Sequence, residues 1–165
     1  MSRRLAIGVV VFVLGVGAAL LAAERPIEQP LPYSHAVHTK EAACVLCHAG
    51  AQSQPNAGIP KFSVCQSCHA TPPPRLAAPD KARWENAAKA KEPEAWNRLY
   101  EVPNHVYFSH RRHVAVGGID CAACHGDMAT STTPPTQAAV PISMRRCVSC
   151  HEREQVTNDC TACHR

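Results

Sequence analysis

Residues 33–48 read YSHAVHTKEAACVLCH, and this stretch contains both elements that decide the fold. It begins with an aromatic residue, a serine and two histidines spaced three apart, from Tyr33 to His38. It ends in Cys-x-x-Cys-His, from Cys44 to His48, the signature for attachment of a c-type haem. The two thiols of such a motif bind the haem covalently, and the adjacent histidine becomes the proximal ligand of its iron.

The Cys-x-x-Cys-His motif occurs five times in 165 residues and uses all ten cysteines. One spacing and one trailing histidine common to all five pairs favour haem over a disulfide scaffold, zinc sites or a redox dithiol. The sequence therefore predicts five covalently bound haem c groups. The predicted attachment residues are Cys44, Cys47, Cys65, Cys68, Cys121, Cys124, Cys147, Cys150, Cys160 and Cys163, and the motif ligands are His48, His69, His125, His151 and His164.

Five of the ten histidines lie outside the motifs, which is one spare histidine per haem. Spare histidines are often surface residues, but these cluster in short segments ahead of motifs, so we expect them to be distal ligands of bis-histidine irons. Two imidazoles at positions i and i+3 cannot readily bind opposite faces of one haem, so each close pair serves two haems. The predicted distal ligands are His35, His38, His105, His110 and His113.

The aromatic-Ser-His-x-x-His unit occurs twice, at 33–38 and again at 108–113 ahead of the third motif. His38 lies six residues before Cys44, whereas His113 lies eight residues before Cys121. The repeat divides the chain into a two-haem module at 24–72, a Pro-rich and helical connector at 73–102 and a three-haem module at 103–165.

The connector differs in composition from the two modules. We expect Asp80 to cap a helix over 81–91, and Pro93 to start a second short helix that runs to residue 100. The aromatic residues Trp84, Trp96 and Tyr100 are expected to pack against haem faces or to bind a partner.

The composition predicts a fold without an ordinary apolar core. Aromatic residues make up only 5% of the chain, and 14 prolines and eight glycines interrupt it. We therefore expect a mainly irregular chain with short α-helices around a haem-packed core, which folds only with its haems. The formal charge is +4, but no Lys/Arg run interleaved with aromatic residues indicates a nucleic-acid partner.

Residues 1–23 are predicted to be a transmembrane anchor or uncleaved signal. The nineteen residues from Leu5 to Ala23 carry no charge and would span about 28 Å as a helix, close to the bilayer thickness. Arg3 and Arg4 favour a cytoplasmic N-terminus, and so a single-pass inner-membrane protein with its haem domain on the periplasmic side. The alternative is a cleaved signal, which leucines at the −3 position of the candidate cleavage sites disfavour.

An aromatic-x-His-x-x-His segment followed by Cys-x-x-Cys-His motifs resembles the class III multihaem cytochromes c, small bis-histidine electron carriers. The resemblance covers about 33–69 and 105–164. In that family the first histidine of a pair binds the haem of the next motif, and the second binds a later haem. The resemblance implies that His35 and His48 bind one iron and that His110 and His125 bind another. It implies that His38 binds the haem of His69 or one of the other module, and that His113 binds the haem of His151 or His164. His105 would bind the remaining iron.

Five haems behind one N-terminal span also resemble the pentahaem subunit of alternative complex III, a quinol-oxidising bacterial membrane assembly, and residues 96–110 add to this likeness. The resemblance implies an electron-transfer protein rather than an enzyme. Such a subunit passes electrons between a quinol-linked respiratory or photosynthetic complex and a periplasmic acceptor. Its partners are the membrane, other subunits of the complex and a soluble donor or acceptor protein.

Two other functions fit the same motifs. The chain is alternatively a free periplasmic electron carrier or a conductive polymer subunit. A multihaem reductase is the third possibility, but reductase chemistry needs an iron with an open position, and five spare histidines for five haems argue against one.

Overall fold

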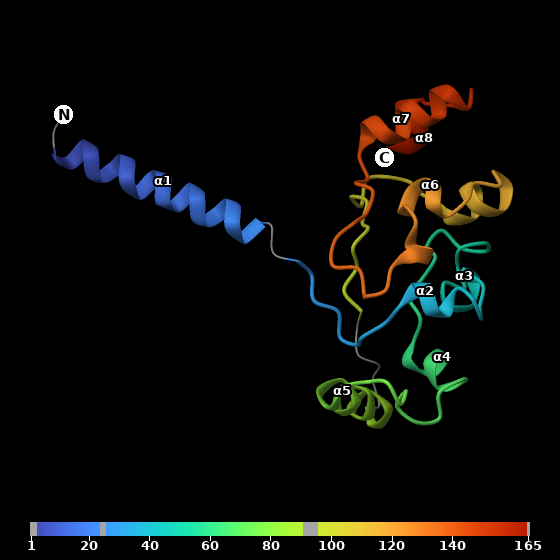
Figure 1. Cartoon of the computed structure of the whole chain (residues 1–165). Coiled ribbons are helices and arrows are strands. Elements are labelled where there is room, and N and C mark those ends of the chain that lie inside the picture. Colours follow the sequence, from blue (N-terminus) through green and yellow to red (C-terminus); the bar gives the residue numbers. More distant parts are fainter. Residues whose placement is uncertain (1–2, 24–25, 91–95, 165) are drawn as a thin grey trace.

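The structure, a computed structural model, describes residues 3–23, 26–90 and 96–164, and all side chains there except those of residues 3, 6 and 18–23. Within these ranges the helices are short and are joined by irregular chain (Figure 1). The only β pairing among the described residues is an isolated antiparallel bridge between Val106 and His164. The elements are α1 (Arg3–Ala23), α2 (His35–His38), α3 (Cys44–Cys47), α4 (Phe62–Gln66), α5 (Ala78–Lys89), the π-helix η1 (Arg111–Val116), α6 (Ala122–His125), the 3-10 helix η2 (Met128–Thr130), α7 (Met144–Arg153) and α8 (Cys160–Cys163).

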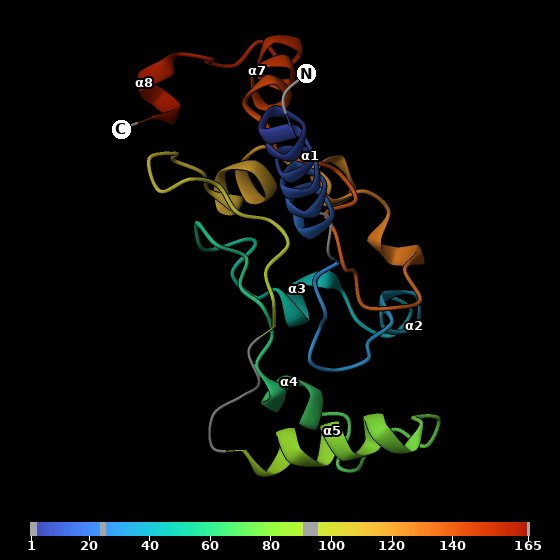
Figure 2. The same cartoon turned by 90° about the vertical axis from the view of Figure 1, so that its left-hand side faces the viewer.

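The described residues form two parts. The long helix α1 extends away from the rest of the chain (Figure 1). The remaining elements form an elongated body, with α4 and α5 at one end, α2, α3 and α6 in the middle, and α7 and α8 at the other end (Figure 2).

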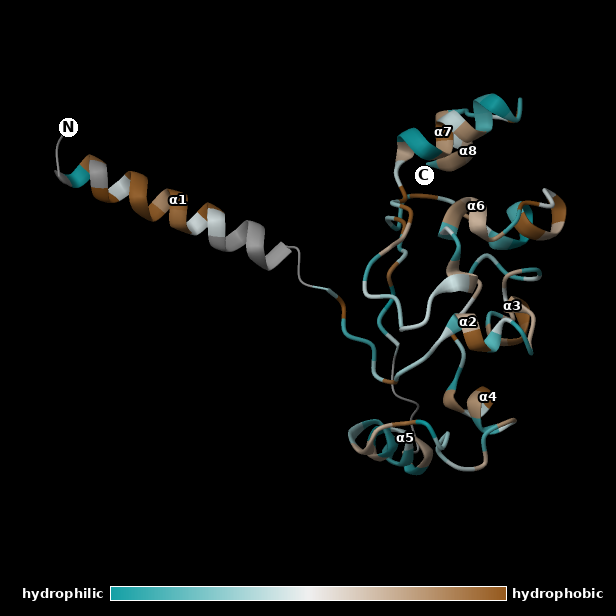
Figure 3. Cartoon of the chain, in the orientation of Figure 1, coloured by the Kyte–Doolittle hydropathy of each residue, from teal (hydrophilic) through white to brown (hydrophobic). Residues whose placement is uncertain are grey.

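Helix α1 presents apolar side chains to solvent along its described length, and Phe12, at 72% exposed, is the most exposed of its large apolar residues (Figure 3). Over the residues whose side chains are described, no helix combines the length and the apolar character needed to cross a membrane. Residues 18–23 of the predicted span lie outside that set.

The elongated body has one small apolar cluster, at the end that carries α4 and α5. Leu31, Phe62, Trp84 and Ala87 are buried together there, and the rings of Phe62 and Trp84 meet edge to face with centroids 5.1 Å apart. Elsewhere in the described chain only Ala51 is a buried apolar residue. So small a core accords with the multihaem fold class predicted from composition.

The connector departs from the prediction in two places. Helix α5 begins at Ala78 with Ala77 as its N-cap, so the prediction that Asp80 caps it was wrong. Pro79 lies in its first turn, where a missing N–H is tolerated, and Asp80 follows inside that turn, 3.4 Å from Arg83.

The second connector helix is absent from residues 96–100, and the rest of its predicted range, 93–95, lies outside the described residues. Asn97 is instead held by the segment that follows α1. Its backbone N–H donates to Gln29 Oε1 at 3.1 Å, and Gln29 Nε2 donates back to its carbonyl at 3.0 Å. These bonds fix the backbone where a helix was expected.

Candidate haem-binding sites

Each Cys-x-x-Cys-His motif lies on a short helical turn. The histidine N–H donates to the carbonyl of the first cysteine in four motifs, at 2.9 Å in the first three and 2.8 Å in the fifth. The fourth motif lies wholly inside α7. One helical turn places residues i and i+3 on the same side, so both thiols of a motif face one group. None of the ten thiols is paired in a disulfide.

Several histidine rings are fixed by backbone carbonyls. Since a carbonyl only accepts, Nδ1 must carry the proton in each of these rings, which leaves Nε2 with the lone pair that binds a metal. Two motif histidines and three spare histidines have this arrangement. The bonds join His48 to Gly58 (2.8 Å), His151 to Thr157 (2.6 Å), His38 to Ser34 (2.8 Å), His110 to Pro55 (3.0 Å) and His113 to Ser109 (2.8 Å).

Four spare histidines each face one motif histidine at nearly the same separation. A metal held between two imidazoles separates their ring centres by roughly 6 Å, because each metal–nitrogen bond is about 2.0 Å and the ring centre lies roughly 1 Å beyond the nitrogen. The observed centroid distances are 6.1 Å for His38–His69, 6.3 Å for His110–His125, 6.1 Å for His113–His151 and 5.6 Å for His105–His164.

His35 is the fifth spare histidine, and its surroundings differ. Its Nδ1 is buried without a protein partner, so that nitrogen needs one from outside the polypeptide. Burial lowers the pKa of His35, and the charges of His48 and then His38 lower it further. A lowered pKa favours the neutral imidazole, which is the form that binds a metal.

The aromatic residue of each repeat packs on both histidines that follow it. Tyr33 lies edge-on to His35 (4.8 Å, 86°) and parallel to His38 (4.4 Å, 20°). Phe108 does the same with His110 (4.8 Å, 87°) and His113 (4.8 Å, 23°). The sequence repeat is therefore also a repeat of ring geometry.

Residues 106–165 match the family model of cytochrome c7 and related cytochromes c. The chain is also 31% identical over 160 residues to the multihaem cytochrome c subunit of menaquinone reductase from Nitratidesulfovibrio vulgaris (strain Hildenborough). That alignment covers 82% of this chain and 75% of the relative. The chain belongs to the multihaem cytochromes c. This cytochrome therefore carries covalently bound haem c and acts in electron transfer.

In each motif of this cytochrome one cysteine is exposed and the other is partly buried. Burial is the largest cause that raises the pKa of Cys47, Cys65, Cys121 and Cys147. Tyr33 lies among the thiols of the first two motifs. Burial raises its pKa to about 12, with further contributions from the charges of Cys47, Cys65 and Cys44. Buried positions of this kind suit an apolar macrocycle.

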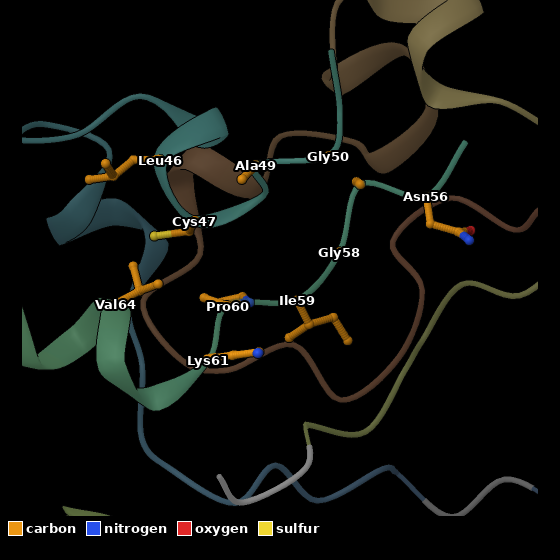
Figure 4. A pocket seen from close by; sticks show the side chains of 11 residues that line it. Leu46, Cys47, Ala49, Gly50, Asn56, Gly58, Ile59, Pro60, Lys61 and Val64 are labelled. Carbon is orange, nitrogen blue, oxygen red and sulfur yellow. The ribbon is translucent and has the colours of Figure 1, made fainter. Parts of the chain in front are cut away.

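An apolar pocket of about 260 Å³ adjoins the first motif. Its walls come from α3, from the loop that precedes α4 and from α4 itself, and they include Leu46, Ile59, Pro60 and Val64 (Figure 4). Cys47 also lines the pocket. A group attached through this thiol meets mainly aliphatic carbon, so the residues fit a haem at this motif.

The structure brings the predicted attachment residues and ligands together as motif turns and histidine pairs. The sequence reasoning missed the backbone partners of the rings, above all Gly58 and Pro55, which no residue type reveals in advance. It also missed that Tyr100 packs on His125 at 4.4 Å and accepts a hydrogen bond from the Val140 N–H at 3.4 Å. The two other predicted connector aromatics, Trp84 and Trp96, lie in or against the apolar cluster around Phe62.

Proposed function

We propose that this cytochrome binds five haems and that each iron is held by one motif histidine and one spare histidine. The four ring pairs at 5.6–6.3 Å are the observation that carries the proposal. The fifth pair follows by elimination, because His35 and His48 are the remaining spare histidine and the remaining motif histidine. The proposed ligand pairs are His35–His48, His38–His69, His110–His125, His113–His151 and His105–His164.

Haem supplies reversible one-electron chemistry at its iron. One spare and one motif histidine would hold each haem iron, which would leave no open position for a substrate. The carbonyls of Ser34 and Ser109 orient the second histidine of each repeat, and the parallel rings of Tyr33 and Phe108 limit its rotation. Two imidazoles fixed in this way would stay bound in both oxidation states of the iron, which suits electron transfer.

Two measurements on the purified holoprotein test this proposal. The denatured chain should keep five haem masses, because thioether bonds survive denaturation. The folded, reduced protein should bind no carbon monoxide, because each iron is saturated by two histidines. Fewer than five retained haems, or stoichiometric carbon monoxide binding, would contradict the proposal.

We further propose that the cytochrome is a subunit of a quinol-linked membrane complex and delivers electrons to, or accepts them from, a periplasmic protein. The 31% identity to a menaquinone reductase cytochrome subunit over most of both chains supports this assignment. The apolar run from Leu5 to Ala23 supports attachment to the inner membrane, with the haem body on the periplasmic side.

Purification from native membranes tests the assignment. Detergent extraction should be required, and other redox subunits should co-purify in fixed ratio. Recovery of a lone protein without detergent would favour a free periplasmic carrier. Replacement of residues 1–23 by a cleavable signal peptide should give a soluble cytochrome with the same haem content.

A further inference from the structure

The two repeats bind each other through the same hydrogen bond made twice. The N–H of Ala36 donates to the carbonyl of Ser131 at 2.9 Å, and the N–H of Arg111 donates to the carbonyl of Gln54 at 3.1 Å. Each donor lies one residue after the first histidine of its repeat. Each acceptor lies six residues after the motif histidine of the other repeat. Reciprocal contacts between equivalent positions are the mark of a two-fold relation.

Equivalent residues of the two motifs also meet. The thiols of Cys44 and Cys121, the first cysteines of the first and third motifs, are in contact. Residues that contact their own equivalents lie near a two-fold axis.

The geometry within each repeat supports the same relation. In the first repeat, the ring centre of His38 lies 6.1 Å from that of His69 in the second motif. In the second repeat, the ring centre of His113 lies 6.1 Å from that of His151 in the fourth motif. The Nδ1–H of the second histidine donates to a serine carbonyl at 2.8 Å in both repeats. A rotation that exchanges the repeats therefore also exchanges the second and fourth motifs.

We infer that a pseudo-two-fold axis passes between the first and third haem-attachment sites, and that the five sites follow one another in space as second, first, third, fourth and fifth. This inference rests on the proposed function, because it takes each motif to hold one haem. The sites that connect the two modules are the first and the third, which are separated in the sequence by the second motif and the whole connector.

Contacts between neighbouring motifs trace the same order outward from the axis. Cys47 of the first motif and Val64, next to Cys65 of the second motif, line the same pocket. Arg146, next to Cys147 of the fourth motif, donates from Nη2 to the carbonyl of Ala123 in the third motif at 2.6 Å. The ribbon agrees, because α4, α3, α6 and α7 succeed one another along the elongated body (Figure 1).

The fifth site has no equivalent in the first repeat. It is joined to the body by the bridge from Val106 to His164 and by the N–H of Tyr107, which donates to the Cys163 carbonyl at 2.8 Å. The symmetric unit is thus a four-site core, and the fifth site extends it at one end.

Iron positions located by anomalous X-ray scattering from the holoprotein test the order directly. The irons of the first and third motifs should be nearest neighbours across the module boundary, and one rotation should superpose the first and second irons on the third and fourth. A second-motif iron lying between the first and third would overturn the inference. A count of fewer than five irons would contradict the proposed function instead, so failure of the proposed function can be told apart from failure of the inferred order.

Variants that lack one haem test the consequence in solution. In partly reduced wild-type protein, electrons that exchange rapidly within the molecule average the haem methyl NMR signals into one shifting set. Cys65→Ala/Cys68→Ala should leave four haems that still average together, and the matched control Cys160→Ala/Cys163→Ala should behave alike. Cys44→Ala/Cys47→Ala should separate the second-motif haem into a set of its own.

The opposite pattern would overturn the order. If loss of the second haem isolates the first, while loss of the first leaves the second averaging with the rest, the sites follow the sequence. Haem content from the mass of each variant confirms that only the intended haem is missing. Where a variant does not fold, the iron positions of the wild-type protein decide.

Discussion

The two repeats reach the same ring geometry through different backbones. In the first repeat, α2 is a single α-helical turn, and His38 lies six residues before Cys44. In the second, His113 lies eight residues before Cys121, and the chain forms the π-helix η1 with a bond from the Gly117 N–H to the Arg112 carbonyl at 2.9 Å. The wider π turn takes up extra residues. The comparison teaches that aromatic and serine contacts fix the histidines, whereas the loop behind them can vary.

The largest effect should follow from removal of the first histidine of either repeat. His35→Ala and His110→Ala should each open one iron, so that the reduced protein binds one carbon monoxide per chain where the wild type binds none. A carbon monoxide difference spectrum measures this, and Arg111→Ala, an exposed neighbour of His110, is the control. The two repeats differ in function if only one of the histidine variants binds the gas.

A smaller effect is expected from the aromatic residue that packs on both histidines. Tyr33→Ala and Phe108→Ala should each lower the free energy of unfolding by about 1–3 kcal/mol, since both rings are half-buried and lose their contacts with two imidazoles. Denaturant titration of the ferric holoprotein measures the loss. Tyr33→Phe, which gives the first repeat the residue of the second, should change stability by less than about 0.5 kcal/mol.

Gly117 and Gly118, which follow η1, test the difference between the loops of the two repeats. Gly118 has a φ of +65°, and a Cβ at Gly117 would lie 2.8 Å from the His113 carbonyl oxygen. Gly118→Ala should destabilise the holoprotein by about 1–2 kcal/mol, because a side chain in the left-handed region meets the backbone. Gly118→Asn should cost less, since asparagine tolerates that region better. Equal losses in thermal unfolding would show that φ is not the cause.

The smallest effect concerns the residue directly before the first cysteine. Asp120 Oδ1 accepts the Ala122 N–H at 2.7 Å, whereas the equivalent residue of the first motif is Ala43, whose extended backbone would suit a cap. Asp120→Ala should cost about 0.5–1 kcal/mol, and Ala43→Asp should stabilise by a similar amount. Paired denaturant titrations measure both, and a loss on Ala43→Asp would contradict the equivalence of the two motifs.

Asp159 makes the same kind of cap before the fifth motif, with Oδ1 accepting the Thr161 N–H at 2.8 Å. That bond and the one from the Thr161 hydroxyl lower the pKa of Asp159. A lowered folded pKa means that the stabilisation is present above the unfolded pKa, and is lost as the pH falls through the folded one. Asp159→Ala should therefore reduce the difference in the free energy of unfolding between neutral and acidic solution.

The local features of the site were predictable from the sequence, because they depend on spacing along the chain. Cys-x-x-Cys fits one helical turn, and the position of His35, three residues before His38, places two ligands beside one aromatic ring. The order of the sites was not predictable, since it depends on bonds such as that from Arg111 to Gln54 between segments far apart in the chain. The start of α5 and the loss of helix around Asn97 were missed because Pro79 and a distant glutamine decide them.

The near-infrared magnetic circular dichroism of the ferric holoprotein tests the central claim most directly, because its charge-transfer bands report both axial ligands of each iron. The account predicts bis-histidine bands whose intensity corresponds to five haems per chain. Bands for a histidine–methionine or a high-spin iron, with bis-histidine intensity for four haems or fewer, would contradict it.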